Sequence, residues 1–143
     1  RFHSPQQEGA IGIVRTADVL RRRFSQFVEP HGISGQQYNV LRILRGADPD
    51  GLACREVCER MITRDPDVTR LLDRLEVRGL IARERNRKDR RVVMVRITQG
   101  GLRLLRRLDG PIVHLHTQHL GHLGTKRLQA LVELLELARE KTA

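Results

Sequence analysis

The stretch from Asp65 to Thr98 constrains the fold of this chain more than any other part of it. Its sequence, DPDVTRLLDRLEVRGLIARERNRKDRRVVMVRIT, predicts a short helix, a glycine turn and two strands joined by a polar loop. The apolar residues of the helix recur at helical spacing: Val68, Leu71, Leu72 and Leu75. This spacing places one face of the helix in a core. The opposite face carries four polar residues: Thr69, Arg70, Asp73 and Arg74.

The two ends of this helix carry residues that helix ends prefer. Asp65 is suited to capping the first turn, and Pro66 to the first helical position. Asp67 favours the positive end of the helix dipole, and Gly79 is suited to closing the helix. We therefore expect a helix over residues 65–78.

The two strands are expected over Ile81–Arg85 and Val92–Ile97, because apolar and polar residues alternate there. Between Arg83 and Arg96 stand only two acidic residues, Glu84 and Asp89, against seven basic ones: Arg83, Arg85, Arg87, Lys88, Arg90, Arg91 and Arg96. This excess of five positive charges is hard to explain by folding alone, and a narrow minor groove attracts an inserted arginine. A merely solvated charged hairpin is the alternative.

The rest of the chain predicts helices on both sides of this stretch. Residues 1–8 are polar and expected to fray. A first helix is expected over 9–28, a second from Ser34 with Gln37 in capping-box spacing, and a third over 54–61 with Val57, Cys58 and Met61 inward and Cys54 exposed. A fifth helix capped by Thr98 is expected to kink or break at Gly110-Pro111. A sixth is expected over 125–141.

Three short helices followed by a hairpin describe a winged helix-turn-helix, in which the second helix of the motif enters the major groove. The fold class is therefore mainly α with a small β-hairpin wing. At 143 residues we expect a single domain, with a DNA-binding lobe over 33–98 and flanking helices over 9–29 and 99–143. The apolar seams of the first, fifth and sixth helices exceed what this lobe needs, which favours a two-fold homodimer.

The charge of the chain favours a polyanionic partner. Its formal net charge is +10, and 24 of its 27 basic residues are arginine, which binds phosphates and guanine edges bidentately. A GC-rich genome would give the same arginine bias, and an anionic membrane surface or an acidic protein remains an alternative partner. No apolar run reaches the roughly 20 residues that span a bilayer, and two cysteines are too few for a disulfide scaffold. We expect a cytoplasmic protein that needs no cofactor and does not bind membranes.

Residues 52–98 resemble the DNA-binding core of the MarR (multiple antibiotic resistance regulator) family. The segment VTRLLDRLEVRGLI (68–81) is similar to its recognition helix and turn, and DRRVVMVRIT (89–98) to its wing. The resemblance implies a homodimer, paired through the first, fifth and sixth helices, that binds a pseudo-palindromic operator as a ligand-responsive repressor. It also implies that Arg91 enters the minor groove and that Asp89 orients it. Ala53 departs from the Ser or Thr that often caps the third helix of the family.

The residues expected to contact or organise DNA lie in two groups. The first belongs to the recognition helix and the residues before it: Arg64, Asp67, Thr69, Arg70 and Arg74. The second belongs to the wing: Lys88, Asp89, Arg90 and Arg91. Lys88 and Arg90 are expected to contact phosphates.

The resemblance further implies a small aromatic or phenolic acid as effector, with Arg15, His31 and Tyr38 as candidates to line its cleft. An empty pocket is the alternative, and Tyr38 can also serve as a core residue. His114, His116, His119 and His122 have no neighbouring Cys or carboxylate to complete a zinc site, so we expect no metal. Redox sensing through Cys54 and Cys58 is likewise not expected.

Other classes of function fit less well. An enzyme needs a nucleophile with a base, a phosphate-cradling loop or a metal set, and the sequence groups none of these. A winged helix used for protein or RNA contacts is the stronger rival. The deep, narrow major groove of duplex RNA would not admit the 65–78 helix.

Overall fold

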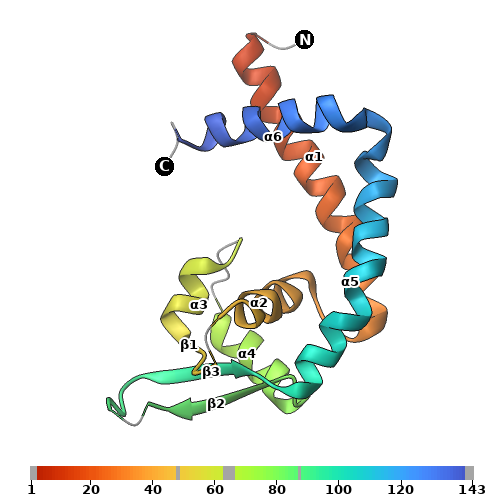
Figure 1. The fold of residues 1–143 in the computed structure, drawn as a ribbon. Helices are drawn as coiled ribbons and strands as arrows, with labels where there is room; N and C mark the ends of the chain where they lie inside the picture. The colour runs from red at the N-terminus through yellow and green to blue at the C-terminus, as the bar shows by residue number, and fades with distance from the viewer. Residues whose placement is uncertain (1–2, 48, 63–66, 87, 141–143) are drawn as a thin grey trace. The chain divides into compact units, whose positions relative to one another are not determined.

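The computed structural model describes residues 3–47, 49–62, 67–86 and 88–140. Its elements follow the chain in this order: α1 (Pro5–Val28), η1 (Glu29–His31), α2 (Gly35–Arg45), β1 (Leu52–Ala53), α3 (Cys54–Arg60), α4 (Val68–Val77), β2 (Ile81–Arg85), β3 (Val93–Ile97), α5 (Gln99–Leu120), η2 (Gly121–Leu123) and α6 (Gly124–Glu140) (Figure 1). The chain forms two compact units, Arg1–Arg107 and Leu108–Ala143, and α5 contributes to both.

The sheet of the first unit is built around the predicted hairpin. β2 and β3 pair antiparallel, with Ile81 opposite Ile97 at the root and Arg85 opposite Val93 toward the tip. β1, which the sequence did not predict, adds a third strand by pairing Leu52 with Val95. Two residues are too few for an alternating pattern to reveal a strand.

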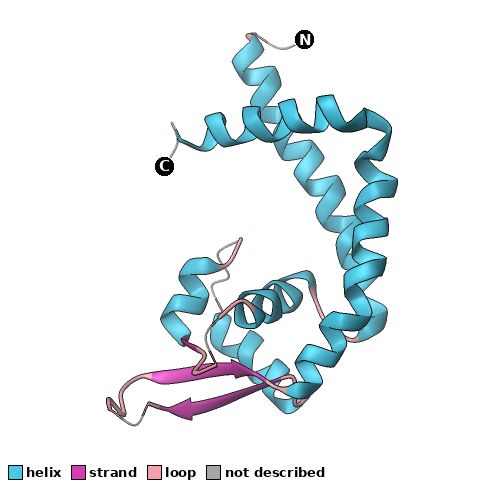
Figure 2. Ribbon diagram, viewed as in Figure 1, coloured by secondary structure: helices cyan, strands magenta, loops and turns pink. Residues whose placement is uncertain are grey.

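The core of the first unit joins α2, α3 and α4 to the sheet (Figure 2). Each of these elements contributes fully buried side chains: Val40, Leu41, Val57, Leu72, Leu75, Ile81 and Val95. Three helices and a hairpin in this arrangement confirm the predicted winged helix-turn-helix. Burial of the three α4 leucines fixes which side of that helix remains available to a partner.

The starts of α1 and α2 follow from their caps. The Ser34 hydroxyl accepts the Gln37 N–H at 3.1 Å and the Gln37 side chain accepts the Ser34 N–H at 2.9 Å, which confirms the predicted capping box. α1 begins at Pro5, with the Ser4 hydroxyl accepting the N–H of Gln7. The expectation that residues 5–8 fray is therefore wrong.

α4 begins later than predicted. Its N-cap is Asp67, whose carboxylate accepts the Arg70 N–H at 3.1 Å, so the helix is not capped by Asp65. Asp65 and Pro66 themselves lie outside the described residues. Gly79 follows the last turn with φ of 65°, a left-handed conformation that confirms its predicted role in closing the helix.

The exposure of the two cysteines of α3 is the reverse of the prediction. Val57 and Met61 are buried as expected, but Cys58 is exposed and Cys54 is half-buried. Cys54 lies three residues before Val57 and shares its helix face, whereas Cys58 is rotated about 100° from Val57. Burial raises the pKa of the Cys54 thiol, which lowers its thiolate fraction.

α5 runs through Gly110-Pro111 as one helix, so of the predicted kink or break the break is wrong. A proline ring keeps a helical φ, and its missing N–H leaves only the carbonyl four residues earlier, that of Arg107, without its helical partner. Arg107 is exposed, so water can satisfy that carbonyl.

The second unit consists of the later turns of α5, η2 and α6. No residue of α6 is buried, and three of its apolar side chains are more than half exposed: Val132, Leu134 and Leu137. Among the described helices of the chain, none is both long and apolar enough to cross a membrane.

Candidate nucleic-acid interface

The outer face of α4 presents its polar residues to solvent because the opposite face is held in the core. Leu71, Leu72 and Leu75 are at most 7% exposed, while Thr69, Arg70, Asp73 and Arg74 are exposed. Asp67, predicted as a DNA contact, serves as the helix cap. Arg64 lies outside the described residues.

The end of α4 is tied to the turn before α2. The Arg78 guanidinium donates to the carbonyl of Gly32 and, at 3.2 Å, to that of His31. Gly32 has φ of 75°, and a Cβ there would lie 2.8 Å from Nη2 of Arg78. Glycine is therefore required at this turn for the arginine to approach.

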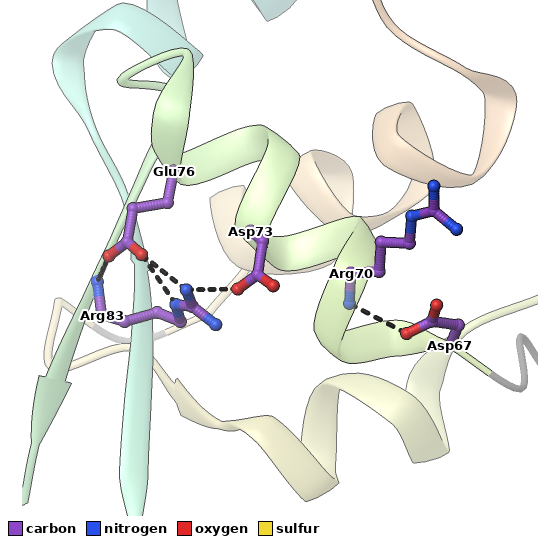
Figure 3. A network of polar contacts seen from close by, with 5 residues as sticks. All are labelled: Asp67, Arg70, Asp73, Glu76 and Arg83. Carbon is purple, nitrogen blue, oxygen red and sulfur yellow. Dashed lines mark hydrogen bonds and ion pairs between the residues drawn. The ribbon is translucent and has the colours of Figure 1, made fainter.

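Arg83 of β2 forms the main polar link between the wing and α4 (Figure 3). Its Nη2 donates to Asp73 at 2.5 Å and to Glu76 at 2.6 Å, and its Nε donates to Glu76 at 2.9 Å. The second oxygen of Glu76 accepts the backbone N–H of Arg83 at 3.1 Å. These bonds to Arg83 lower the pKa of Glu76 and raise the pKa of Arg83. Arg70 points away from this network.

The tip of the wing is organised by two side chains that accept backbone hydrogens. The Asn86 side chain accepts the N–H of Lys88 at 2.8 Å and that of Asp89 at 3.3 Å. The Asp89 carboxylate accepts the backbone N–H of Arg91 at 3.0 Å. Asp89 therefore fixes the main chain at Arg91, not the guanidinium that we expected it to hold.

The network sorts the basic residues of the interface into two sets. Arg83 and Arg96 are used within the fold, because Arg83 binds α4 and Arg96 pairs with Glu84 across the hairpin. The second set is exposed and forms no ion pair with any residue that the structure describes: Arg70, Arg74, Arg85, Lys88, Arg90 and Arg91. This second set is the surface that can attract a polyanion.

Two hollows border Arg70 and Arg74, and both reach Gln37 of α2. One, of about 250 Å³, also includes Ser34 and Gln36 at the start of α2. The other, of about 520 Å³, extends along α4 to Val77 and Arg78. Gln36 could not be predicted as a neighbour of Arg70, since the two are far apart in the chain.

The three residues expected to bind an effector do not share either hollow. Tyr38 is 7% exposed, stacks edge-on against Phe24 with ring centroids 5.1 Å apart, and accepts a hydrogen bond from Arg42. His31 lies beside Phe27 in η1, with ring centroids 5.9 Å apart. Arg15 is exposed on α1.

Comparison with known proteins shows to which family this arrangement belongs. A family model described as "MarR family" matches residues 31–92. The crystal structure of a MarR transcription factor from Planctomyces limnophilus is 41% identical, covers 96% of this chain and 99% of its own, and superposes with a TM-score of 0.74. This chain belongs to the MarR family.

Other MarR-family proteins are similar over nearly the same length. The homoprotocatechuate degradative operon repressor of Escherichia coli is 25% identical over 126 residues, which are 88% of this chain and 84% of the relative. The structure of an S. aureus MepR–DNA complex has a TM-score of 0.82 over 92% of this chain and 96% of its own, and at 20% identity it bears on the fold alone. MarR-family regulators bind DNA, so this chain is a DNA-binding transcriptional regulator and not an enzyme.

Proposed function

We propose that this MarR-family regulator binds a pseudo-palindromic operator as a homodimer and represses transcription from it. The observation that carries this proposal is the set of six exposed cations on α4 and the wing that no described residue pairs. The relative named as an operon repressor supports repression as the outcome of binding.

In this proposal α4 lies in the major groove, where Arg70, Arg74 and Thr69 face the base edges and phosphates. A helix of ten residues is about 15 Å long, which suits a groove about 12 Å wide. Asp67 acts by setting the start of the helix, and Arg64, which precedes it in the sequence, remains a proposed DNA contact. Two copies would place their α4 helices about one helical turn, 34–36 Å, apart on the duplex.

The wing tip is proposed to reach the flanking minor groove. Arg91 would enter the groove, where the negative potential is concentrated, while Lys88 and Arg90 contact phosphates. Asp89 supports this arrangement by holding the Arg91 main chain at the tip. Of the rival functions, contact with a protein gives this concentration of unpaired arginines no specific role, and the deep, narrow major groove of duplex RNA would not admit α4.

Substitution of the two predicted contacts tests the proposal. The probe is a duplex selected by the wild-type protein from a randomised library. Arg91→Ala should weaken binding to it by about 1–3 kcal/mol, or roughly 5- to 150-fold, and reduce the salt dependence of binding. Arg70→Ala should relax the sequence preference, because a base contact carries specificity and a phosphate contact does not.

Glu59→Gln is a suitable control, since its exposed carboxylate pairs with Arg55 on α3. Unchanged affinity of Arg91→Ala throughout the salt titration would refute the wing contact. An equal loss for Arg70→Ala on selected and random duplexes would reduce Arg70 to a phosphate anchor.

Release by an effector is the second part of the proposal. The relative whose name refers to homoprotocatechuate degradation supports a phenolic acid as the class of effector, and Arg15, His31 and Tyr38 remain the candidate residues. A set of phenolic acids titrated into the preformed DNA complex tests this directly. If none of them shifts the binding curve, a phenolic acid is not the effector.

A further inference from the structure

We propose that Arg83 is a positioning residue for DNA binding, which fixes the wing at the angle to α4 that lets both elements contact one duplex. The inference rests on the proposed DNA contacts of Arg70 and Arg91, because it concerns how these two contacts are kept in register. Arg83 itself is turned toward α4 and is engaged by its carboxylates (Figure 3).

The position of Arg83 in the sheet suits this role. It lies in the middle of β2, opposite Val95, whose strand also pairs with β1. Arg83 therefore lies near the root of the hairpin, within the part that β1 supports, and this support ends one pair further on, at Met94 and Glu84. Beyond Arg85 and Val93 the chain continues to the tip without a strand partner from β1.

The geometry of the contact is restrictive. The Glu76 carboxylate receives both the main chain and the guanidinium of Arg83, and Asp73 receives the same Nη2 from one helical turn away. Bonds from a planar guanidinium to two carboxylates on one helix define an orientation as well as a distance. A single lysine ammonium would define only the distance.

The length of the wing makes the angle at its root important. Strands rise about 3.3 Å per residue, so the six steps from Arg83 to Asp89 span at most roughly 20 Å. At that length a tilt of about 10° at the root would move the tip by roughly 3–4 Å, which is more than the length range of a hydrogen bond allows. A loose root would thus separate Arg91 from its groove while α4 stays bound.

Arg83 also neutralises negative charge beside the DNA-facing residues. Asp73 and Glu76 share α4 with Arg70 and Arg74, so loss of Arg83 would leave two uncompensated carboxylates on the proposed binding helix. The electrostatic role and the positioning role both predict that substitution of Arg83 weakens DNA binding. For substitution of the two carboxylates, the electrostatic role predicts stronger DNA binding and the positioning role predicts weaker binding.

Two variants separate the roles. Arg83→Met removes the guanidinium and keeps an unbranched apolar stem. Asp73→Asn with Glu76→Gln removes both charges and leaves residue 76 one acceptor oxygen in place of the two that receive Arg83, which weakens the same contact from the helix side and makes the surface more positive. If charge alone mattered, the first would weaken DNA binding and the second would strengthen it.

Positioning predicts instead that both variants remove the contribution of Arg91. Binding to the selected duplex should fall about tenfold with Arg83→Met, within the range of losses expected for one contact. Arg91→Ala should then cost less than about twofold in either variant background, against a clear loss in the wild-type background. If Arg83 and Arg91 acted independently, the losses of affinity caused by their substitutions would add. The part of the Arg91→Ala loss that is missing in a variant background therefore measures the coupling between the two residues.

Arg96→Met is the matched control. Arg96 pairs with Glu84 across the same hairpin and does not link it to α4. Arg91→Ala should keep its full cost in the Arg96→Met background. Circular dichroism of every variant establishes that the fold is retained, and the carboxamide pair still tests the contact if Arg83→Met does not fold.

Additive losses of Arg91→Ala and Arg83→Met, or a full Arg91 cost in the carboxamide background, would overturn the positioning role while leaving the proposed function intact. If Arg91→Ala has no effect in the wild-type protein, the proposed wing contact fails first and this inference falls with it. Loss of the Arg91→Ala cost in both variant backgrounds, with the full cost kept in the Arg96→Met background, is the result that supports it.

Discussion

Glu76 makes the link between α4 and the wing sensitive to pH, because protonation of its carboxylate would weaken the contact with Arg83. Its bonds to Arg83, by side chain and main chain, lower its pKa below the ordinary value of 4.5. A carboxyl whose pKa is lower in the folded protein than in the unfolded chain stabilises the fold above the unfolded pKa. That contribution disappears as the pH falls through the folded pKa.

Glu76→Gln should therefore lower the free energy of unfolding at neutral pH, and its difference from wild type should close at pH values below about 4.5. The difference should be at most about 1 kcal/mol, because the Glu76 side chain is 37% exposed and solvent screens the pair. Urea unfolding at several pH values measures it. A difference that stays constant into the acid range would show that the charge of Glu76 is not involved.

Individual residues also show where the sequence was informative about the site and where it was not. The exposure of Thr69, Arg70 and Arg74 followed from the helical period, because the leucines of α4 fix its orientation. The ion pairs of Arg83 did not follow, because they depend on how the wing folds back beside α4. The sequence alone presents Arg83 as one more cation of the wing.

At the scale of elements, the sequence correctly predicted the features that are determined by residues close together in the chain. The capping box of α2 and the strand bounds of β2 depend on residues a few positions apart, and the structure reproduces them. β1 and the passage of α5 through Pro111 were missed. β1 exists only because β3 pairs with it. Pro111 is accommodated because the one carbonyl that it leaves unpaired belongs to Arg107, which is exposed to water.

The start of α5 lies so close to the sheet that only glycine fits at one position. A Cβ on Gly101 would clash with the carbonyl oxygen of Leu80 and lie 2.7 Å from Cγ1 of Ile97. The Thr98 hydroxyl fixes this approach from the other side, since it donates to the Gly79 carbonyl at 2.6 Å and accepts the Gly101 N–H at 3.2 Å.

Gly101→Ala should therefore destabilise the protein by about 1–3 kcal/mol, the usual cost of overpacking a close contact. Gly12→Ala in α1 is the control, because a Cβ there meets nothing within 4 Å beyond its own chain neighbours and helix backbone. It should be neutral or stabilising by up to about 1 kcal/mol through helix propensity. Chemical denaturation of both variants measures the contrast, and equal effects would contradict the close approach.

At the scale of the whole molecule, the apolar residues that remain outside the core call for a partner. Val132, Leu134 and Leu137 of α6 are 53%, 65% and 60% exposed, and Ile13 of α1 and Val113 of α5 are also exposed. Burying apolar surface on three helices is a favourable basis for association. We expect the covering partner to be a second copy, since the proposed operator is itself two-fold symmetric.

The central claim is that two copies of α4 and the wing read one operator, and a hydroxyl-radical footprint on the selected duplex tests it most directly. We predict two symmetric protected regions one helical turn apart, with the outer minor-groove protection lost in Arg91→Ala. The double variant Leu134→Asp with Leu137→Asp should lose the paired pattern. Val77→Asp, which places one such charge on the exposed side of α4, should remain dimeric in sedimentation. A single protected region without two-fold symmetry in the wild-type protein would contradict the account.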